Sequence, residues 1–359
     1  MLSRFVGGVS STRRARLALS TRCLLSVLAT GSSERLSSLS GELTLITFDV
    51  DGTLVRGSSG RAPPSSPPSL SSAESSSESS LSGAERSAHA RAFAHGVGTV
   101  LGRGRKVPLP AELLPPEQYH GSTDGLIALR LARAALGIPP DEAVVELPRV
   151  FASMYEYCAA LSDEQMTVGI DPLPGVLDTL RSLAGNSRVV CGLVTGNVEG
   201  IARKKMRAVG VLGTGALAPA APSQTWASEA DAAFLGGFGS DYCSGELDDP
   251  SRNHLDRAEQ IVIAAKRCRE LLGPDASLTR VVHVGDAPSD VLAAKHCADA
   301  GRLGDGTVVG CVGVATGSYS ASHLRELCGE PRAGVWEPVV LDSGLADAGF
   351  VRACGVEES

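Results

Sequence analysis

Hydrophobic and polar positions follow two different patterns along the chain. From residue 171 onwards, short continuous apolar runs alternate with segments of helical period, and the runs are RVVCGLVTGN (188–197), TRVVHVGD (279–286) and TVVGCVGVATG (307–317). TLITFDV (44–50) has the same character near the start. Strands that are apolar on both faces and separated by helices are typical of a parallel sheet with helices on both sides. We therefore predict an α/β fold with a doubly wound parallel sheet.

The helices between these runs have recognisable ends. Pro174 begins one and Gly185 ends it, while Asn197 is expected to cap a second that stops at Gly210. Others are expected at about Leu255–Leu272 and over SDVLAAKHCADAG (289–301). Residues 211–253 are expected to form a long loop around one short strand near Phe234.

A helical region precedes this part of the chain. Helical patterns cover Ala84–Leu101, Asp124–Leu136 with Gly137 at its end, and about Asp141–Leu161, with no strand pattern between them. The Ser/Pro-rich stretch 57–83 is interpreted as a disordered linker, with a phosphorylated regulatory loop as the alternative. The resulting division is a leader (1–40), a core (41–56 and 169–346), the insertion (57–83), a small helical domain (84–168) and a C-terminal tail (347–359).

Composition and charge exclude several classes. The 359 residues carry a net charge of -7 without an aromatic-interleaved basic stripe, which argues against nucleic acid as a partner. No apolar stretch approaches the roughly 20 residues of a membrane-spanning helix, so no membrane partner is predicted. The 9 cysteines form no C-x-x-C pair and are interpreted as reduced thiols.

The first 33 residues differ from the rest. They contain five arginines and no acidic residue, and they are rich in serine, which is typical of an organellar transit peptide. A mitochondrial or plastid location is therefore expected, and a cytoplasmic one otherwise. A disordered basic arm and a weak secretory core at Cys23–Ala29 are the alternatives.

Polar side chains stand at the ends of the predicted strands. Asp49 and Asp51 follow the first strand, Thr195 ends the second, and Asp286 follows a third. The carboxyl ends of parallel strands meet at one edge, where ligands bind. On the helix after Val198, Lys205 falls in the inward stripe, unless it is exposed or snorkels outward.

Three carboxylates, a lysine and a hydroxyl suit phosphoryl transfer. Oxygen ligands are those that Mg²⁺ prefers. A carboxylate can also act as the nucleophile and form an aspartyl phosphate that water then hydrolyses. The expected cofactor is Mg²⁺, and the expected partner is a small phosphorylated metabolite.

The motifs resemble those of a known family. DVDGT (49–53), VTGN (194–197), Lys205 and GDAPSD (285–290) are similar to the four ordered motifs of the haloacid dehalogenase-like hydrolase superfamily. Four further stretches are similar to its phosphoglycolate phosphatase-like branch: HGSTDGLIALRLA (120–132), LVTGNVEGIARKKM (193–206), GGFGSD (236–241) and VATGSYSASHL (314–324).

The resemblance implies a role for each matching residue. Asp49 would be the nucleophile, Asp51 the general acid/base, and Lys205 the group that orients Asp49. Thr195 would bind the phosphoryl group. Gly52, Thr53, Gly196 and Asn197 would help through their backbone N–H groups. The Mg²⁺ ligands would be the Asp49 carboxylate, the Asp51 backbone carbonyl, Asp286 and, in addition, Asp290.

Several of these residues have a second interpretation. Asp290 can equally be a carboxylate favoured by a helix N-terminus. The loop HGSTDG, with Gly121 and Thr123, either faces the substrate or forms an ordinary helix cap. His120 and His283 match no family role and are interpreted as packed residues. The helical domain (84–168) lies where this family inserts a helical cap. Such a cap would exclude water from the site and determine which leaving groups fit.

The predicted function is a Mg²⁺-dependent phosphatase acting on a small metabolite, phosphoglycolate-like or a sugar phosphate, through an aspartyl phosphate. A phosphosugar mutase of the same superfamily and a non-catalytic binding protein on the same fold are the alternatives.

Overall fold

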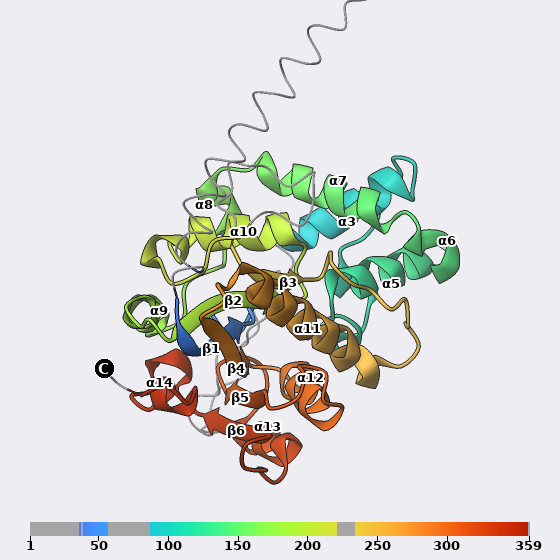
Figure 1. Ribbon diagram of the computed structural model, residues 1–359. Helices are drawn as coiled ribbons and strands as arrows, with labels where there is room; N and C mark the ends of the chain where they lie inside the picture. Colours follow the sequence, from blue (N-terminus) through green and yellow to red (C-terminus); the bar gives the residue numbers. More distant parts are fainter. Residues whose placement is uncertain (1–35, 37–38, 57–86, 221–233, 358–359) are drawn as a thin grey trace, which may run out of the picture.

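The computed structural model describes residue 36 and residues 39–56, 87–220 and 234–357. The expected transit peptide (1–40) lies outside the described residues except for residues 36, 39 and 40. The Ser/Pro-rich insertion (57–83) lies wholly outside them. Figure 1 shows the described chain as coloured ribbon.

A sheet of six parallel strands forms the centre of the described chain, in the order β3-β2-β1-β4-β5-β6. The strands are β1 (Gly41–Phe48), β2 (Val189–Thr195), β3 (Gly236–Phe238), β4 (Ala276–Gly285), β5 (Val308–Val314) and β6 (Trp336–Leu341). The predicted α/β fold is confirmed.

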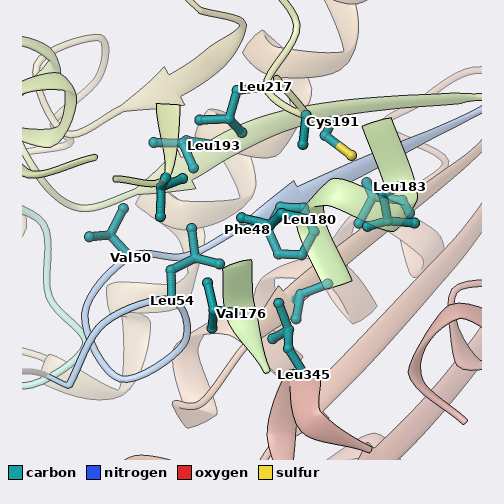
Figure 2. Close-up of a cluster of buried hydrophobic side chains, with 14 of the residues drawn as sticks. Phe48, Val50, Leu54, Val176, Leu180, Leu183, Cys191, Leu193, Leu217 and Leu345 are labelled. Carbon is teal, nitrogen blue, oxygen red and sulfur yellow. The ribbon is translucent and has the colours of Figure 1, made fainter. Parts of the chain in front are cut away.

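The central position of β1 explains its apolar sequence. Leu43 and Leu45 pack into one hydrophobic cluster while Ile46 and Phe48 pack into another, as expected for side chains that alternate between two sheet faces. Helices α9 (Val176–Ala184) and α14 (Phe350–Ala353) contribute to the cluster around Phe48, part of which is drawn in Figure 2.

The opposite face of the sheet is covered by three helices. They are α11 (Asn253–Leu271), α12 (Pro288–Asp299) and α13 (Ala321–Cys328), and their apolar residues join the cluster around Leu43 and Leu45. In Figure 1, α11 and α12 lie on the other side of the strands from α9 and α14.

The region between β1 and β2 is helical and has its own hydrophobic cluster. Its helices are α3 (Ala88–Val100), α4 (Pro110–Leu113), α5 (Asp124–Leu136), α6 (Pro140–Val144), α7 (Leu147–Ala159) and α8 (Asp163–Met166). The single helix expected over Asp141–Leu161 is divided into α6 and α7, because Pro148 lacks a backbone N–H and is placed in the first turn of a new helix. Val198, the residue before α10 (Glu199–Ala208), and Ile201 within α10 join this cluster.

Two features near the C-terminus were not predicted. β6 was missed because Pro338 interrupts its pattern, and proline is tolerated there because β6 is an edge strand. The expected tail (347–359) is a correction: Phe350 and Cys354 are buried, and the Phe350 ring stacks on Phe48 at 6.4 Å between centroids.

Short 3₁₀ turns complete the described elements: η1 (Pro116–Gln118), η2 (Leu212–Thr214), η3 (Pro250–Arg252) and η4 (Gly344–Ala346). Within the described residues, every helix falls short of the length and apolarity needed to cross a membrane.

Candidate active site

A cavity of about 190 Å³ lies at the carboxyl edge of the sheet. We call its two sides the core wall and the cap wall. The core wall includes Asp49, Asp51, Asn197, Arg257, Asp286 and Gly317. The cap wall includes His89, Phe93, Tyr119, His120, Gly121 and Ile127. The strand ends and the helical region thus face each other across one small space.

Three carboxylates converge on the core wall. One oxygen from each of Asp49, Asp286 and Asp290 lies within 4.8 Å of the others, and all three residues are buried. Burial raises the pKa of Asp286 well above its usual value, and the negative charges of Asp290 and Asp49 raise it further. A group of hard oxygen donors whose charges repel one another suits a small divalent cation, so these residues fit the expected metal site.

Glycines allow the backbone to approach Asp286 closely. A Cβ on Gly52 would stand 2.3 Å from Asp286 Oδ2, and one on Gly317 would stand 1.7 Å from the same oxygen. Gly52 also has a φ of 91°, which side chains disfavour. Two segments therefore contribute backbone to the site: the DVDGT motif, which contains Gly52, and the loop after β5, which contains Gly317.

Arg257 on α11 binds the expected nucleophile. Its Nη1 donates to Asp49 Oδ1 at 2.7 Å and to the backbone carbonyl of Val194 at 3.0 Å, and its Nε lies 3.4 Å from Asp290 Oδ1. Burial raises the pKa of Asp49 and Arg257 partly offsets this. Burial opposes the charge of Arg257, yet Asp49 and Asp290 raise the pKa of its guanidinium, so it remains a cation.

The sequence analysis missed Arg257, although its helix carried a signal. Arg257 lies on the same stripe of α11 as the buried residues Ile261, Ala264 and Cys268. A cation on the inward stripe was the reason for selecting Lys205, and the same test on the later helix selects Arg257.

Lys205 is buried and points into the site, but it binds Asp51. Its Nζ lies 2.7 Å from Asp51 Oδ2 and 3.0 Å from Oδ1, and 2.7 Å from Asn197 Oδ1. Burial raises the pKa of Asp51, but the Lys205 ammonium beside it acts in the opposite direction, and the pKa is lowered on balance. The contact with Asp49 that the resemblance assigned to Lys205 is made by Arg257 instead.

Arg203 and Lys204 lie outside the inward stripe of α10 that contains Lys205, yet both are buried. The helical region covers the outer face of α10. Lys204 Nζ donates to the carbonyls of Ala159 and Leu161 at the end of α7, and Arg203 pairs with Glu199 at 2.5 Å. Hence α10 has no solvated face over this stretch.

The expected phosphate-binding residues divide into two groups. Gly52, Gly196 and Asn197 line the cavity. Thr195 is fully buried and its Oγ1 accepts from Asn197 N at 3.3 Å, while Thr53 Oγ1 donates to Asp286 Oδ1 at 3.2 Å.

Asn197 does not cap its helix. The N-cap position of α10 is Val198, which offers no side-chain cap. The Asn197 amide instead donates to Asp51 Oδ2 at 3.0 Å and accepts from Lys205. The prediction of an Asn197 cap was wrong because the side chain makes its hydrogen bonds with a nearby carboxylate and ammonium instead of with the helix backbone.

Asp290 and His283 form a buried chain with Thr47. Asp290 Oδ2 accepts from Ala287 N at 3.1 Å, so its helix-capping interpretation holds alongside its place in the carboxylate group. His283 Nε2 lies 3.1 Å from Asp290 Oδ1, and its Nδ1 lies 3.0 Å from Thr47 Oγ1. His283 was interpreted as a packed residue; it is packed, and it also contacts a candidate metal ligand.

On the cap wall, Asp124 joins the helical region to the core. Its Oδ2 accepts from Val198 N at 2.7 Å and lies 2.8 Å from His89 Nε2, and His89 Nδ1 lies 3.2 Å from Lys205 Nζ. Since Lys205 can only donate, His89 accepts at Nδ1 and donates from Nε2 to Asp124.

Both interpretations of HGSTDG apply, to different residues. Thr123 Oγ1 accepts from Leu126 N at 3.5 Å and is fully buried as the N-cap of α5. Gly121 and Ser122 line the cavity, as does His120, whose pKa is lowered by burial.

A parallel α/β core with a helical insertion after its first strand, and with opposed carboxylates and cations at its carboxyl edge, defines an enzyme fold suited to phosphoryl transfer. The chain belongs to the haloacid dehalogenase-like hydrolase family, whose model matches residues 43–297. No curated protein gives a significant match.

Two solved structures were found to be similar to the chain. One is a haloacid dehalogenase-like family hydrolase from Streptococcus pneumoniae, with 14% identity, a TM-score of 0.36, and coverage of 84% of this chain and 95% of that one. The other is β-phosphoglucomutase from Clostridium difficile, with 11% identity, a TM-score of 0.39, and coverage of 88% and 97%. At these scores neither adds an argument about activity.

Proposed function

We propose that this chain is a Mg²⁺-dependent phosphatase that hydrolyses a small phosphorylated metabolite through an aspartyl phosphate. The observation that carries the proposal is the division of charge at the core wall. Asp49 is held by Arg257 beside Asp286 and Asp290, while Asp51 is held by Lys205. This division supports the use of one carboxylate for attack and of a separate one for proton transfer.

In the first step, an Asp49 oxygen forms a bond to phosphorus and the ester P–O bond breaks. Arg257 binds Oδ1 of Asp49, which keeps the carboxylate ionised and fixes its direction. The leaving oxygen takes a proton from Asp51, and the alcohol departs. Asp51 must therefore be protonated when the ester is cleaved.

In the second step, water attacks the phosphorus of the aspartyl phosphate and the P–O bond to Asp49 breaks, which restores the carboxylate and releases inorganic phosphate. Asp51 accepts the proton of the water. The lowered pKa of Asp51 favours its base form and works against its acid form. Phosphate that competes for Lys205 would weaken this effect and let Asp51 hold the proton in the first step.

Mg²⁺ would be held by Asp49, Asp286 and Asp290, with the backbone carbonyl of Asp51 as a further ligand from the family resemblance. When bound, it supplies positive charge against the phosphate oxygens. Lys205 and Arg257 line the same cavity and add two further positive charges against the phosphate oxygens.

The size of the cavity supports a small substrate. About 190 Å³ is shared by the phosphoryl group and the leaving group, whereas drug-sized ligands use pockets of roughly 300 Å³ or more. A phosphoglycolate-like compound or a small sugar phosphate is therefore the proposed substrate.

A product assay tests the proposal. The full chain is incubated with Mg²⁺ and a panel of small phosphate esters, and both free phosphate and isomerised sugar phosphate are measured. Free phosphate that depends on Mg²⁺ and on Asp49 supports a phosphatase. Isomerised product without free phosphate would assign a mutase, and no turnover of any ester together with Mg²⁺-independent ester binding would assign a non-catalytic binding protein.

A further inference from the structure

Arg130 on α5 is a buried cation without a carboxylate among its described hydrogen-bond partners. The residue is 1% exposed. Its four acceptors are all neutral: the carbonyls of Gln118 and Leu247, the Ser122 hydroxyl and the Asn253 side-chain oxygen. Burial lowers the pKa of its guanidinium. Asp256 and Asp248 are near enough to raise the pKa of the guanidinium, but neither is a hydrogen-bond partner of Arg130 among the described residues. A buried charge is costly, so hydrogen bonds spent wholly on neutral groups point to a specific use.

Two of these hydrogen bonds fix the two ends of one loop. Nη1 donates to Gln118 O at 2.6 Å and to Ser122 Oγ at 2.8 Å. The intervening residues, Tyr119, His120 and Gly121, line the cavity on the cap wall. The guanidinium therefore holds the substrate-facing loop Tyr119–Ser122 from behind.

The loop has little freedom to compensate for a loss of this support. Gly121 has a φ of 66°, and a Cβ there would stand 2.8 Å from Ser289 Oγ. The Ser122 carbonyl lies where a Cβ on Gly196 would meet it at 2.6 Å. The loop thus touches two parts of the core wall, and a small displacement changes the shape of the cavity.

The other two hydrogen bonds fix the loop to the core. Arg130 Nη2 donates to Asn253 Oδ1 at 3.0 Å, and Nε donates to Leu247 O at 3.4 Å. Asn253 is the first residue of α11, and Arg257 lies one turn further along this helix. The fork geometry of arginine lets one side chain address both segments, which lysine cannot do.

We propose that Arg130 is a positioning residue for substrate selection, which sets the loop Tyr119–Ser122 on the cap wall and fixes it to the start of α11. The proposal rests on the proposed phosphatase function. It assigns Arg130 no contact with the substrate. Its effect is on the leaving group, because the loop belongs to the cap wall and the phosphoryl-transfer residues belong to the core wall.

The variant Arg130→Met keeps the length of the side chain and removes its donors, and Arg130→Lys keeps the charge but not the fork. Arg133→Met is the matched control, because Arg133 lies on the same helix in an exposed pair with Asp248. Each is assayed with acetyl phosphate, whose leaving group is small, and with 4-nitrophenyl phosphate, whose ring extends further from phosphorus.

For Arg130→Met we expect kcat/KM on 4-nitrophenyl phosphate to fall by about tenfold to a hundredfold, mainly through KM, and that on acetyl phosphate to change by less than about threefold. Arg130→Lys should fall between this variant and the wild type, and Arg133→Met should match the wild type. Equal losses on both substrates, or none on either, would overturn the proposal.

Hydrogen exchange supplies a readout that does not need activity. The His120 and Ser122 amides donate to Pro116 O and Tyr119 O in the folded loop. In Arg130→Met their exchange should be faster, with α7 and the core strands unchanged. If wild type hydrolyses neither ester, the proposed function fails while this result still decides the role of Arg130. Unchanged loop exchange, or loss of folding in both Arg130 variants, would overturn the positioning role.

Discussion

The two walls of the cavity are held together by different interactions. On the core wall, Asp49 and Asp290 are joined to Arg257 by buried ion pairs. On the cap wall, the loop Tyr119–Ser122 is held by Arg130 through neutral acceptors. Breaking a buried ion pair is costly because it leaves an uncompensated charge, about 3–5 kcal/mol, whereas a hydrogen bond from a charged donor to a neutral acceptor contributes about 1.5–3 kcal/mol.

Under the proposed function, this difference separates phosphoryl transfer, at the core wall, from substrate selection, at the cap wall. In the proposed mechanism, Asp49, Arg257 and Asp286 act at the phosphoryl group, which all phosphate esters share. The cap-wall loop meets only what lies beyond the phosphoryl group. Changes to the core wall should therefore affect every substrate alike, and changes to the cap wall should affect substrates according to their leaving groups.

The largest effect should come from Asp49→Asn. The amide is a poor nucleophile, so we expect Mg²⁺-dependent phosphate release to fall by about 10⁴-fold or more on all esters. Folding should be retained, because the substitution also removes repulsion with Asp286 and Asp290. Phosphate release and circular dichroism check both parts, and near-normal turnover would exclude the mechanism.

Arg257→Met should be next in size. It removes the cation that binds Asp49, and we expect kcat to fall by about 10²- to 10³-fold on every ester. The apo protein should lose about 3 kcal/mol of stability, because the carboxylates are left uncompensated. Mg²⁺ should therefore raise the Tm of this variant more than that of the wild type.

The matched control is Arg267→Met. Arg267 lies on α11, as Arg257 does, and the substitution removes its partly buried ion pair with Asp241. It should lower the Tm without changing the response to Mg²⁺. An equal Mg²⁺ response in wild type and Arg257→Met would contradict the role assigned to Arg257.

His283→Asn should have a smaller effect, confined to the metal. His283 supports Asp290 from 3.1 Å, and loss of such support costs about tenfold in metal affinity. Titration of Mg²⁺ by calorimetry checks this without a substrate. Thr47→Val removes the contact with His283 Nδ1 and the hydrogen bond from Thr47 Oγ1 to the Val282 carbonyl, and it should show a weaker shift in the same direction. Unaltered Mg²⁺ affinity in His283→Asn would show that Asp290 needs no such support.

The smallest effect should come from Asp124→Asn on the cap wall. The amide oxygen can still accept from Val198 N, but the charge opposite His89 is lost. We expect kcat/KM to fall about fivefold on 4-nitrophenyl phosphate and to change little on acetyl phosphate. A uniform loss on both esters would remove the distinction between the two walls.

Much of the site could be predicted from short stretches of sequence. Asp49, Asp51 and Asp286 follow apolar strands, and the parallel sheet brings those strand ends to one edge. Lys205 was selected by helical period and points into the cavity. These inferences needed only the local period and the rule that ligands bind at the carboxyl ends of parallel strands.

Helical period could have selected Arg257 as an inward-facing cation, but neither its partner Asp49 nor the contact between His283 and Asp290 could be predicted in this way. Arg257 is 208 residues from Asp49 along the chain. Asp49 and Asp51 are only two residues apart, so the local sequence does not show which of them binds Lys205. The burial of Arg203 and Lys204 could not be predicted either, because helical period identifies an apolar stripe but does not show whether a second layer covers the opposite face.

The sequence by itself determined the parallel core, the order of the motifs and the identity of the carboxylates, since these depend on local period and on residues next to each strand end. Only the tertiary structure decided which cation binds which carboxylate, that His283 supports Asp290, and that Arg130 holds the cap-wall loop. Those contacts join segments far apart in the chain, and their geometry is set by how helices and loops pack, which the period of a single segment does not contain.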